Sequence, residues 1–350
     1  MSNAPAIPET PTPADAQPET VHVSVLAAET LDGLAPQPGG VFIDGTLGGA
    51  GHTSLLLERT APDGRVLGID ADQAAIARAQ KRLTSEIASG RLILRQGNFA
   101  QMAEFAREAG LPSVDGILLD LGLSSDQLAD RARGFSFSAG GEENTLDMRF
   151  DASPTSTRPT SADLLNTLDE AALADIFWRY GEERRSRALA RRIVEARKRA
   201  PITRADEFAR LVASVIHGRP GGVHPATRAF QALRIAVNDE LASLEAALPA
   251  ALDVLRVGGR LAVISFHSLE DRIVKRFFQA EERGCVCPPE APVCVCGRAA
   301  RLRILTRHPI LAGEAELAAN PRARSAKLRV AERIEAGSNG APKEASYAEE

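Results

Sequence analysis

The chain has 350 residues, a formal net charge of −4 and 44% hydrophobic residues, a composition typical of a soluble globular protein. This length allows one large domain or two modest ones. No apolar run is long enough to cross a bilayer, and residues 1–20 lack the basic start and apolar centre of a signal peptide. We therefore expect a cytoplasmic protein with a disordered extension at 1–20 and a disordered tail at 335–350.

The first predicted element is an apolar strand, Val41–Asp44, which runs into a glycine-rich turn and then a helix over 53–59. A second apolar strand, 66–70, follows and ends in Asp70. Glycines let a ligand approach the backbone, and the next helix presents its N–H groups to that ligand. A carboxylate that ends the second strand can accept hydrogen bonds from both ribose hydroxyls. The pattern indicates a Rossmann-like site for a nucleoside cofactor.

The choice of cofactor depends on the residues of this turn. The glycines do not follow the G-x-G-x-x-G pattern of dinucleotide sites, and Asp44 beside the turn would repel a pyrophosphate. S-adenosylmethionine carries a cationic sulfonium and an amino group, and it tolerates that carboxylate. We expect S-adenosylmethionine, with a nicotinamide-dependent oxidoreductase and a turn without any ligand as the alternatives.

Strand and helix patterns alternate through the first half of the chain. Further strands are predicted over Leu92–Gln96 and 116–120, with a helix over 73–87, which indicates a parallel sheet covered by helices on both faces. After about residue 130 the buried strands disappear and helical patterns dominate, including one over 186–198. We predict an α/β fold in which a Rossmann-like domain, 21–130 and 240–334, is interrupted by a helical insert, 131–239.

Leucines recur at helical spacing from Leu241 to Leu255, and they predict a helix that ends at Gly258 and Gly259. The later predicted elements are, in chain order, a buried strand over 261–264, a helix over 269–279 and two edge strands over 301–306 and 327–331.

Arginine is concentrated in two blocks, 178–204 and 298–329, whereas the acidic residues lie mainly in the tails and the early chain. The planar guanidinium suits bidentate contacts with phosphates. Solvated helix faces are the alternative explanation. Two basic blocks beside a nucleoside-cofactor fold favour a polyanionic substrate.

The fourth strand ends at Asp120, at the sheet edge where α/β proteins bind ligands. Ser124, Ser125 and Gln127 follow it closely, so they could reach a cofactor or a substrate. Alternatively, the serines cap the next helix.

Several motifs spread along the chain resemble those of one family. They are residues 44–52, 115–127, 133–137, 146–149, 180–184, 224–228, 230–234, 265–272 and 320–325. From about His22 to Arg333 the chain resembles the bacterial small-subunit ribosomal RNA cytosine-N4 methyltransferases, the RsmH/MraW family. The resemblance implies a Rossmann-like, S-adenosylmethionine-dependent methyltransferase sheet, with the insert used for RNA recognition.

The activity that this resemblance implies is transfer of a methyl group to the exocyclic N4 of a cytidine in the decoding region of 16S ribosomal RNA. The partner would be 16S rRNA or the small ribosomal subunit, without a membrane or an evident protein partner. The alternative is a non-catalytic ribosome-assembly factor that binds RNA and retains the cofactor fold. The family's cofactor contacts carry over onto Ala50, Gly51, His52, Asp70, Phe99, Asp120 and Gln127. Without the resemblance, Phe99 would equally suit the core.

Methyl transfer to N4 needs an acceptor for a proton and an aligned base, since the amine lone pair is delocalised into the ring. The fourth strand is not followed by the Asn/Asp-Pro-Pro-Tyr/Phe motif that amino-methyltransferases often use. Our hypothesis is that Asp120 or the Ser124–Ser125 pair accepts from N4 and that Phe266 stacks on an extruded cytosine. His267 is a further catalytic candidate, with a structural histidine as the alternative.

All four cysteines fall in one short segment, at Cys285, Cys287, Cys294 and Cys296. Disulfides are rare in cytoplasmic proteins. Four thiols from one loop could hold a tetrahedral zinc, although the usual spacing is C-x₂₋₄-C rather than C-x-C. Reduced, unliganded thiols are the alternative, and we assign no metal ligand from the sequence.

Overall fold

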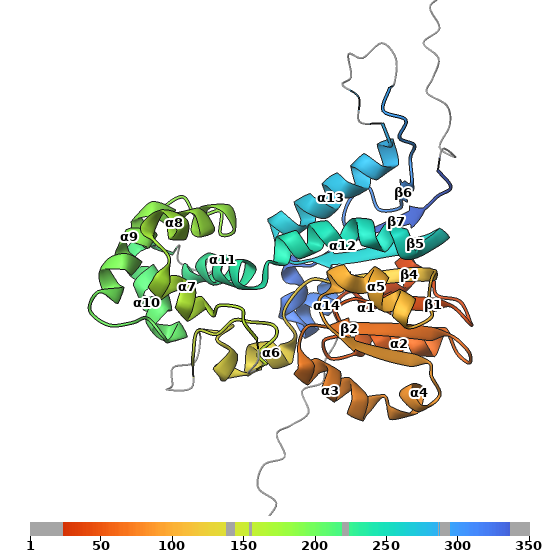
Figure 1. Cartoon of the computed structure of the whole chain (residues 1–350), viewed down its shortest axis with the longest axis horizontal. Helices are drawn as coiled ribbons and strands as arrows, with labels where there is room; N and C mark the ends of the chain where they lie inside the picture. The colour runs from red at the N-terminus through yellow and green to blue at the C-terminus, as the bar shows by residue number, and fades with distance from the viewer. Residues whose placement is uncertain are drawn as a thin grey trace, which may run out of the picture.

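A seven-stranded sheet forms the centre of the computed structural model, which describes residues 24–137, 144–153, 156–218, 224–285, 287 and 295–336. The strand order is β3-β2-β1-β4-β5-β7-β6 (Figure 1). Neighbours from β3 to β5 pair in parallel, whereas β7 is antiparallel to both β5 and β6. The predicted extension at 1–20 and most of the predicted tail lie outside the described residues.

The parallel strands are mostly apolar because helices cover both faces of the sheet. The strands of the sheet are β1 (Val41–Asp44), β2 (Arg65–Asp70), β3 (Leu92–Gln96), β4 (Val114–Asp120), β5 (Leu255–Ser265), β6 (Leu302–Ile304) and β7 (Lys327–Arg333). Alternate side chains enter two separate cores, so that Ile43 and Leu119 face one and Phe42 and Leu118 face the other.

Each core is closed by a different set of helices. The first is covered by α5 (Met102–Glu108), α12 (Glu240–Val254) and α13 (Ser268–Arg283). The second is covered by α1 (Ala27–Leu34), α2 (Gly51–Arg59), α3 (Gln73–Arg82) and α14 (Glu314–Ala319). The sequence predicted a single helix over 73–87, but the structure divides it at Leu83, whose buried side chain accompanies a non-helical backbone, before α4 (Thr84–Ala88).

The helices between β4 and α12 have a hydrophobic core of their own and stand to one side of the sheet (Figure 1). After the short α6 (Ser125–Ala129) they are α7 (Ser161–Thr167), α8 (Glu170–Arg179), α9 (Ser186–Arg197), α10 (Ala205–Val215) and α11 (Ala226–Asn238). Within this core the ring of Phe208 packs against the rings of both Phe177 and Phe230. Arg187 and Arg191 of α9 are exposed on its other side, because Leu189 and Ile193 occupy the buried stripe of the helix.

Two predictions about the last strands are wrong. The leucine-rich helix α12 ends at Val254, and Leu255 already pairs with Val114 as the first residue of β5. Gly258 and Gly259 therefore lie inside β5, where Gly258 takes a φ of +81° beside a shift in strand register, and they do not end a helix.

The second correction concerns β7, which was predicted to be an edge strand. It lies between β5 and β6, and of the two late strands only β6 is at the edge. Across the parts of the chain that the structure describes, no helix has the length and apolar character needed to span a membrane.

Candidate cofactor and substrate site

A cavity of about 290 Å³ opens at the carboxyl ends of the parallel strands. It is lined by residues that follow each strand, namely Gly48 after β1, Asp70 on β2, Phe99 after β3, Asp120 on β4 and Phe266 after β5. The five positions converge because the carboxyl ends of parallel strands share one edge. The sheet thus brings together most of the site residues that the sequence predicted.

The glycine-rich turn after β1 wraps around the Asp70 carboxylate. Gly48 has a φ of +49°, which favours glycine, and its N–H donates to Asp70 Oδ2 at 2.8 Å. Ala50 also has a left-handed conformation and precedes α2, but it does not line the cavity. Gly51 and His52 do line it, so Ala50 shapes the turn while its neighbours face the ligand space.

Asp70 is held by the backbone on both of its oxygens. Besides the Gly48 contact, Oδ1 accepts from the N–H of Asp72 at 2.8 Å. Each carboxylate oxygen keeps a further lone pair, which could accept from a ribose hydroxyl. Burial raises the pKa of Asp70 to about 6, so the group is still mainly ionised at neutral pH.

Asp120 carries the most unusual acceptor of the site. Its Oδ1 is buried and has no hydrogen-bond partner among the described residues, although the group lines the cavity. Burial, followed by the charges of Asp44 and Glu270, raises the pKa of Asp120 to about 7. A carboxylate with that pKa exchanges a proton readily at neutral pH.

His52 lies beside Asp120 without forming an ion pair at neutral pH. Its Nε2 is 3.7 Å from Asp120 Oδ2, and burial lowers the pKa of His52 to about 4. The imidazole is therefore neutral at pH 7. It forms a wall of the cavity and adds no positive charge that would hold Asp120 ionised.

Asp44 influences the charges of the cavity without lining it. Its Oδ2 accepts from the hydroxyl of Thr53 at 2.6 Å. Burial raises the pKa of Asp44 itself, and the charge of its ionised form adds to the effect of burial in raising the pKa of Asp70 and of Asp120. The site is thus electrostatically negative, which suits a cationic ligand and disfavours a pyrophosphate.

Gln127 and Ser124 bond to each other at the start of α6. Ser124 Oγ accepts from the N–H of Gln127 at 3.1 Å, while Gln127 Oε1 accepts from the N–H of Ser124 at 3.0 Å. The hydroxyl of Ser124 is therefore used as a helix cap, as in the alternative explanation from the sequence. Gln127 Nε2 also donates to Asp72 at 3.3 Å, and Ser124, Ser125 and Gln127 all line the cavity.

Phe266 and His267 are adjacent in sequence but have different surroundings. The ring of Phe266 lines the cavity and lies over Gly122, where a Cβ would come within 2.9 Å of it. His267 does not line the cavity. It is the N-cap of α13, its Nδ1 accepts from the N–H of Glu270 at 3.4 Å, and its Nε2 lies 3.0 Å from Glu270 Oε1.

Several cavity residues were not predicted from the sequence. The insert and α12 contribute Phe150, Asn238, Glu240 and Ser243, and the segment after α14 contributes Asn320 and Arg322. Arg322 could have been predicted from the sequence, because it belongs to the motif at 320–325. Its guanidinium donates to the hydroxyl of Ser125. No sequence pattern pointed to Asn238, because its place depends on contacts with a distant segment. Its Oδ1 accepts from the N–H of Phe150 at 2.7 Å, and its Nδ2 donates to the carbonyl of Met148 at 2.7 Å.

A group of buried charged and titratable side chains lies at the side of the cavity next to α12. Glu240, His267 and Glu270 lie close enough to suggest a metal site. However, Arg234 already forms a two-bond pair with Glu240, at 2.7 and 2.8 Å, and its Nη2 is 4.0 Å from Glu270. The guanidinium supplies the positive charge that a metal would bring, so we assign no metal here.

Comparison with known proteins agrees with this geometry. Residues 19–334 match the MraW methylase family. The chain belongs to this family. The protein is accordingly an S-adenosylmethionine-dependent methyltransferase with a Rossmann-like fold, which confirms the predicted fold class and cofactor.

Curated relatives match about nine-tenths of this chain. A protein of Thermomicrobium roseum named Ribosomal RNA small subunit methyltransferase H is 54% identical over 315 residues, covering 90% of this chain and 94% of the relative. A protein of the same name from Geobacter sulfurreducens is 52% identical over 318 residues, covering 89% and 99%. The family predicted from the motifs is therefore confirmed, while the roles of individual site residues stay predictions.

Proposed function

We propose that this S-adenosylmethionine-dependent rRNA methyltransferase transfers its methyl group to the exocyclic N4 of a cytidine in the decoding region of 16S rRNA. The names of the curated relatives support small-subunit rRNA as the substrate. One observation supports an amine as the group that receives the methyl. Asp120 is a buried carboxylate that lines the cavity, and its Oδ1 has no hydrogen-bond partner among the described residues, so it could accept a proton from the amine. We place the reaction in the cytoplasm, where small subunits are assembled.

The cofactor would occupy the half of the cavity beside β1, β2 and β3. Asp70 would accept from the ribose hydroxyls, Phe99 would offer an apolar face to adenine, and Gly51 would let the methionine part approach the backbone. The negative potential from Asp44 suits the cationic sulfonium, which supplies an electrophilic methyl group. Gln127 would line the same pocket, held in place by Asp72.

Asp120 is the group that we propose as the acceptor of the N4 proton. The nitrogen becomes a better nucleophile as its proton moves to a nearby base. A carboxylate whose pKa is raised to about 7 by burial is basic enough for this role and is ionised in about half of the molecules at neutral pH. Ser124 is less suited, because its hydroxyl already caps α6.

Phe266 would hold the target base. A cytosine inside a helical stem is inaccessible, so such enzymes extrude the base and stack it on an apolar ring. The ring of Phe266 lines the cavity beside Gly122, which lies two residues after Asp120. A base stacked there would present its amine near the proposed acceptor. We assign His267 to positioning, since it caps α13 behind Phe266.

The insert would bind the surrounding RNA through its phosphates. Arg184, Arg187 and Arg191 are exposed on and before α9, on the side away from the insert core. Such contacts hold a polyanion without reading its sequence. Arg322 at the cavity itself could meet a phosphate next to the extruded nucleotide.

The test is mass spectrometry of nucleosides from small subunits isolated from cells that lack the enzyme, after incubation with the protein and S-adenosylmethionine. The expected product is N4-methylcytidine, lost with Asp70→Ala through failed cofactor binding and with Asp120→Asn through failed turnover. Methylation at another atom would refute the assignment to N4. Cofactor binding without any methylated nucleoside would instead favour a non-catalytic assembly factor.

A further inference from the structure

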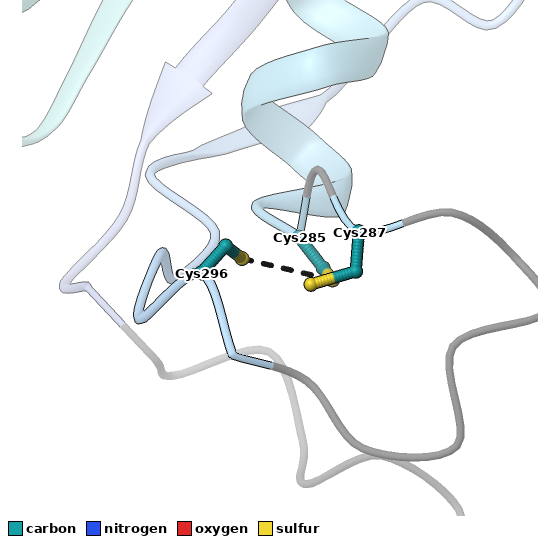
Figure 2. A group of neighbouring side chains, drawn as sticks. All are labelled: Cys285, Cys287 and Cys296. Atoms are coloured by element: carbon teal, nitrogen blue, oxygen red, sulfur yellow. Dashed lines mark hydrogen bonds between the residues drawn. The ribbon is translucent and has the colours of Figure 1, made fainter.

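Three cysteine sulfurs meet at the far end of α13 (Figure 2). Cys285 and Cys287 follow the helix, and Cys296 approaches from the chain that leads to β6. The sulfur atoms of all three lie within 4.8 Å of one another, and those of Cys285 and Cys296 are 3.8 Å apart. The fourth cysteine of the sequence, Cys294, lies outside the described residues.

The 3.8 Å between the sulfurs of Cys285 and Cys296 matches the edge of a metal–thiolate tetrahedron. Zinc–sulfur bonds are about 2.3 Å long, so two sulfurs bound to one tetrahedral zinc lie about 3.8 Å apart. A disulfide would require about 2.05 Å. The backbone N–H of Val295 is 3.4 Å from the sulfur of Cys287, the kind of outer contact that supports a metal-bound thiolate.

The two chain segments that carry these cysteines are fixed to each other by other contacts. Glu281 on the last turn of α13 binds Arg298 at 3.1 Å and Arg301 at 2.7 Å, and its carbonyl accepts from the N–H of Arg301 at 2.9 Å. Gly284 ends the helix with a φ of +69°, and a Cβ there would meet the backbone of Ala300 at 2.3 Å. These contacts fix the end of α13, which precedes Cys285, against the segment that follows Cys296.

The electrostatic setting also favours a cation bound by thiolates. The carboxyl end of a helix carries a partial negative charge, and Cys285 lies directly after the cap of the 16-residue helix α13.

We propose that Cys285, Cys287 and Cys296 bind a structural zinc ion. Thiolate-rich tetrahedral sites select zinc or iron–sulfur clusters, and three sulfurs around one centre suit a single zinc. Binding displaces the thiol protons and ties the end of α13 to the segment before β6. None of the three residues lines the cofactor cavity, and α13 is about 24 Å long, so the ion would not take part in methyl transfer.

The first experiment is elemental analysis of the full chain, purified without a histidine tag under reducing conditions. One zinc per chain is expected, and Cys285→Ser combined with Cys296→Ser should remove it. His308→Ala is the matched control, since this exposed histidine lies beyond the site and should leave the zinc content unchanged. Cofactor binding measured by calorimetry would verify that each variant is folded.

A second measurement uses the unmodified chain, in case the cysteine variants do not fold. After zinc is removed with a chelator, added Co²⁺ should produce a thiolate-to-cobalt charge-transfer band that stoichiometric Zn²⁺ abolishes. Iron in place of zinc, a Cys285–Cys296 disulfide in the purified chain, or no cobalt band with fully reduced thiols would each overturn the proposal.

Discussion

The guanidinium of Arg133 lies 3.1 Å from the carboxylate of Asp72, in a buried junction between the sheet and the insert. Asp72 caps α3 two residues after Asp70, and Arg133 also donates to the backbone carbonyls of Arg149 and Phe150, each at 2.8 Å. Because Phe150 lines the cavity, this pair connects the cofactor edge of the sheet to the insert.

Replacing Arg133 by leucine should therefore affect both stability and cofactor binding. The change leaves Asp72 buried without its cation and two carbonyls without a donor, a loss of about 3–5 kcal/mol in the free energy of unfolding. Urea unfolding would measure it, and calorimetry should show weaker S-adenosylmethionine binding. The matched control is Arg158→Leu, which breaks an exposed pair with Asp239 and should cost about 1 kcal/mol or less. Equal effects of the two variants would contradict the role of the buried pair.

The pKa of Asp120 predicts how activity depends on pH. If its ionised form accepts the N4 proton, kcat/KM should rise with pH and level off above about 7, the pKa to which burial raises this group. Single-turnover rates between pH 5.5 and 8.5, in buffers of constant ionic strength, would give the profile. Asp120→Asn should lower the rate by roughly 10²-fold or more while cofactor binding persists. A pH-independent rate would rule out Asp120 as the base.

The same group should affect stability in the opposite direction. Since the pKa of Asp120 in the fold exceeds the ordinary value of 3.8 for this group, the folded chain binds the proton more tightly than the unfolded chain does. Stability is therefore lost as pH rises from about 4 to about 7, and Asp120→Asn should escape this loss. We expect the variant to be more stable than the wild type at pH 8 and similar to it at pH 4, as measured by urea unfolding. A wild type more stable than the variant at pH 8 would contradict the raised pKa.

The sequence predicted correctly those features that depend only on the residue pattern within a single strand. The parallel strands read as apolar runs that end in Asp44, Asp70 and Asp120, so both the sheet and its ligand edge could be predicted. Leu255 was misleading because it continues the leucine spacing of α12 although its backbone is already extended. Periodicity alone does not distinguish the last turn of a buried helix from the first residue of a buried strand.

Other features depended on contacts that no local pattern contains. Charged residues alternate along β7, which is typical of an edge, but Arg329 is buried and forms an ion pair with Asp271 of α13 at 2.6 Å. Likewise, Asn238 and Glu240 enter the cavity because the chain returns from the insert to the sheet at that point. Such positions become visible only when the packing of distant segments is known.

The contact between Gly122 and Phe266 gives a prediction that is specific to the part of the cavity where we propose that the target base binds. A methyl group at position 122 would lie 2.9 Å from the Phe266 ring and would displace it. Gly122→Ala should slow turnover by roughly 10- to 100-fold, because small misplacements of a bound base are costly. Phe266→Ala should act similarly, and S-adenosylmethionine affinity should change little in both. Gly313→Ala, at a site with no neighbouring atom within 4 Å, is the control and should behave as wild type.

The exposed arginines of the insert predict how RNA binding depends on salt. Arg187 has no carboxylate within 4.0 Å among the described residues, whereas Arg191 lies 3.7 Å from Glu170. Arg187→Ala should therefore weaken RNA binding more than Arg191→Ala, and Arg191→Ala combined with Arg192→Ala should also weaken it. Each phosphate contact that is lost should reduce the slope of log K against log salt by roughly 0.7 to 0.9. Filter binding of a decoding-region RNA at several salt concentrations would measure these slopes.

The control for this series lies on the opposite edge of the sheet. Arg65 is exposed at the start of β2, away from the carboxyl-end cavity, and Arg65→Ala removes the same charge. If the insert holds the RNA, the Arg65 variant should keep the wild-type slope while the α9 variants lose theirs, with cofactor affinity equal in all. Equal losses from both edges would indicate that only net charge matters, because a diffuse electrostatic attraction does not depend on where a charge is removed. The insert would then have no specific part in holding the substrate.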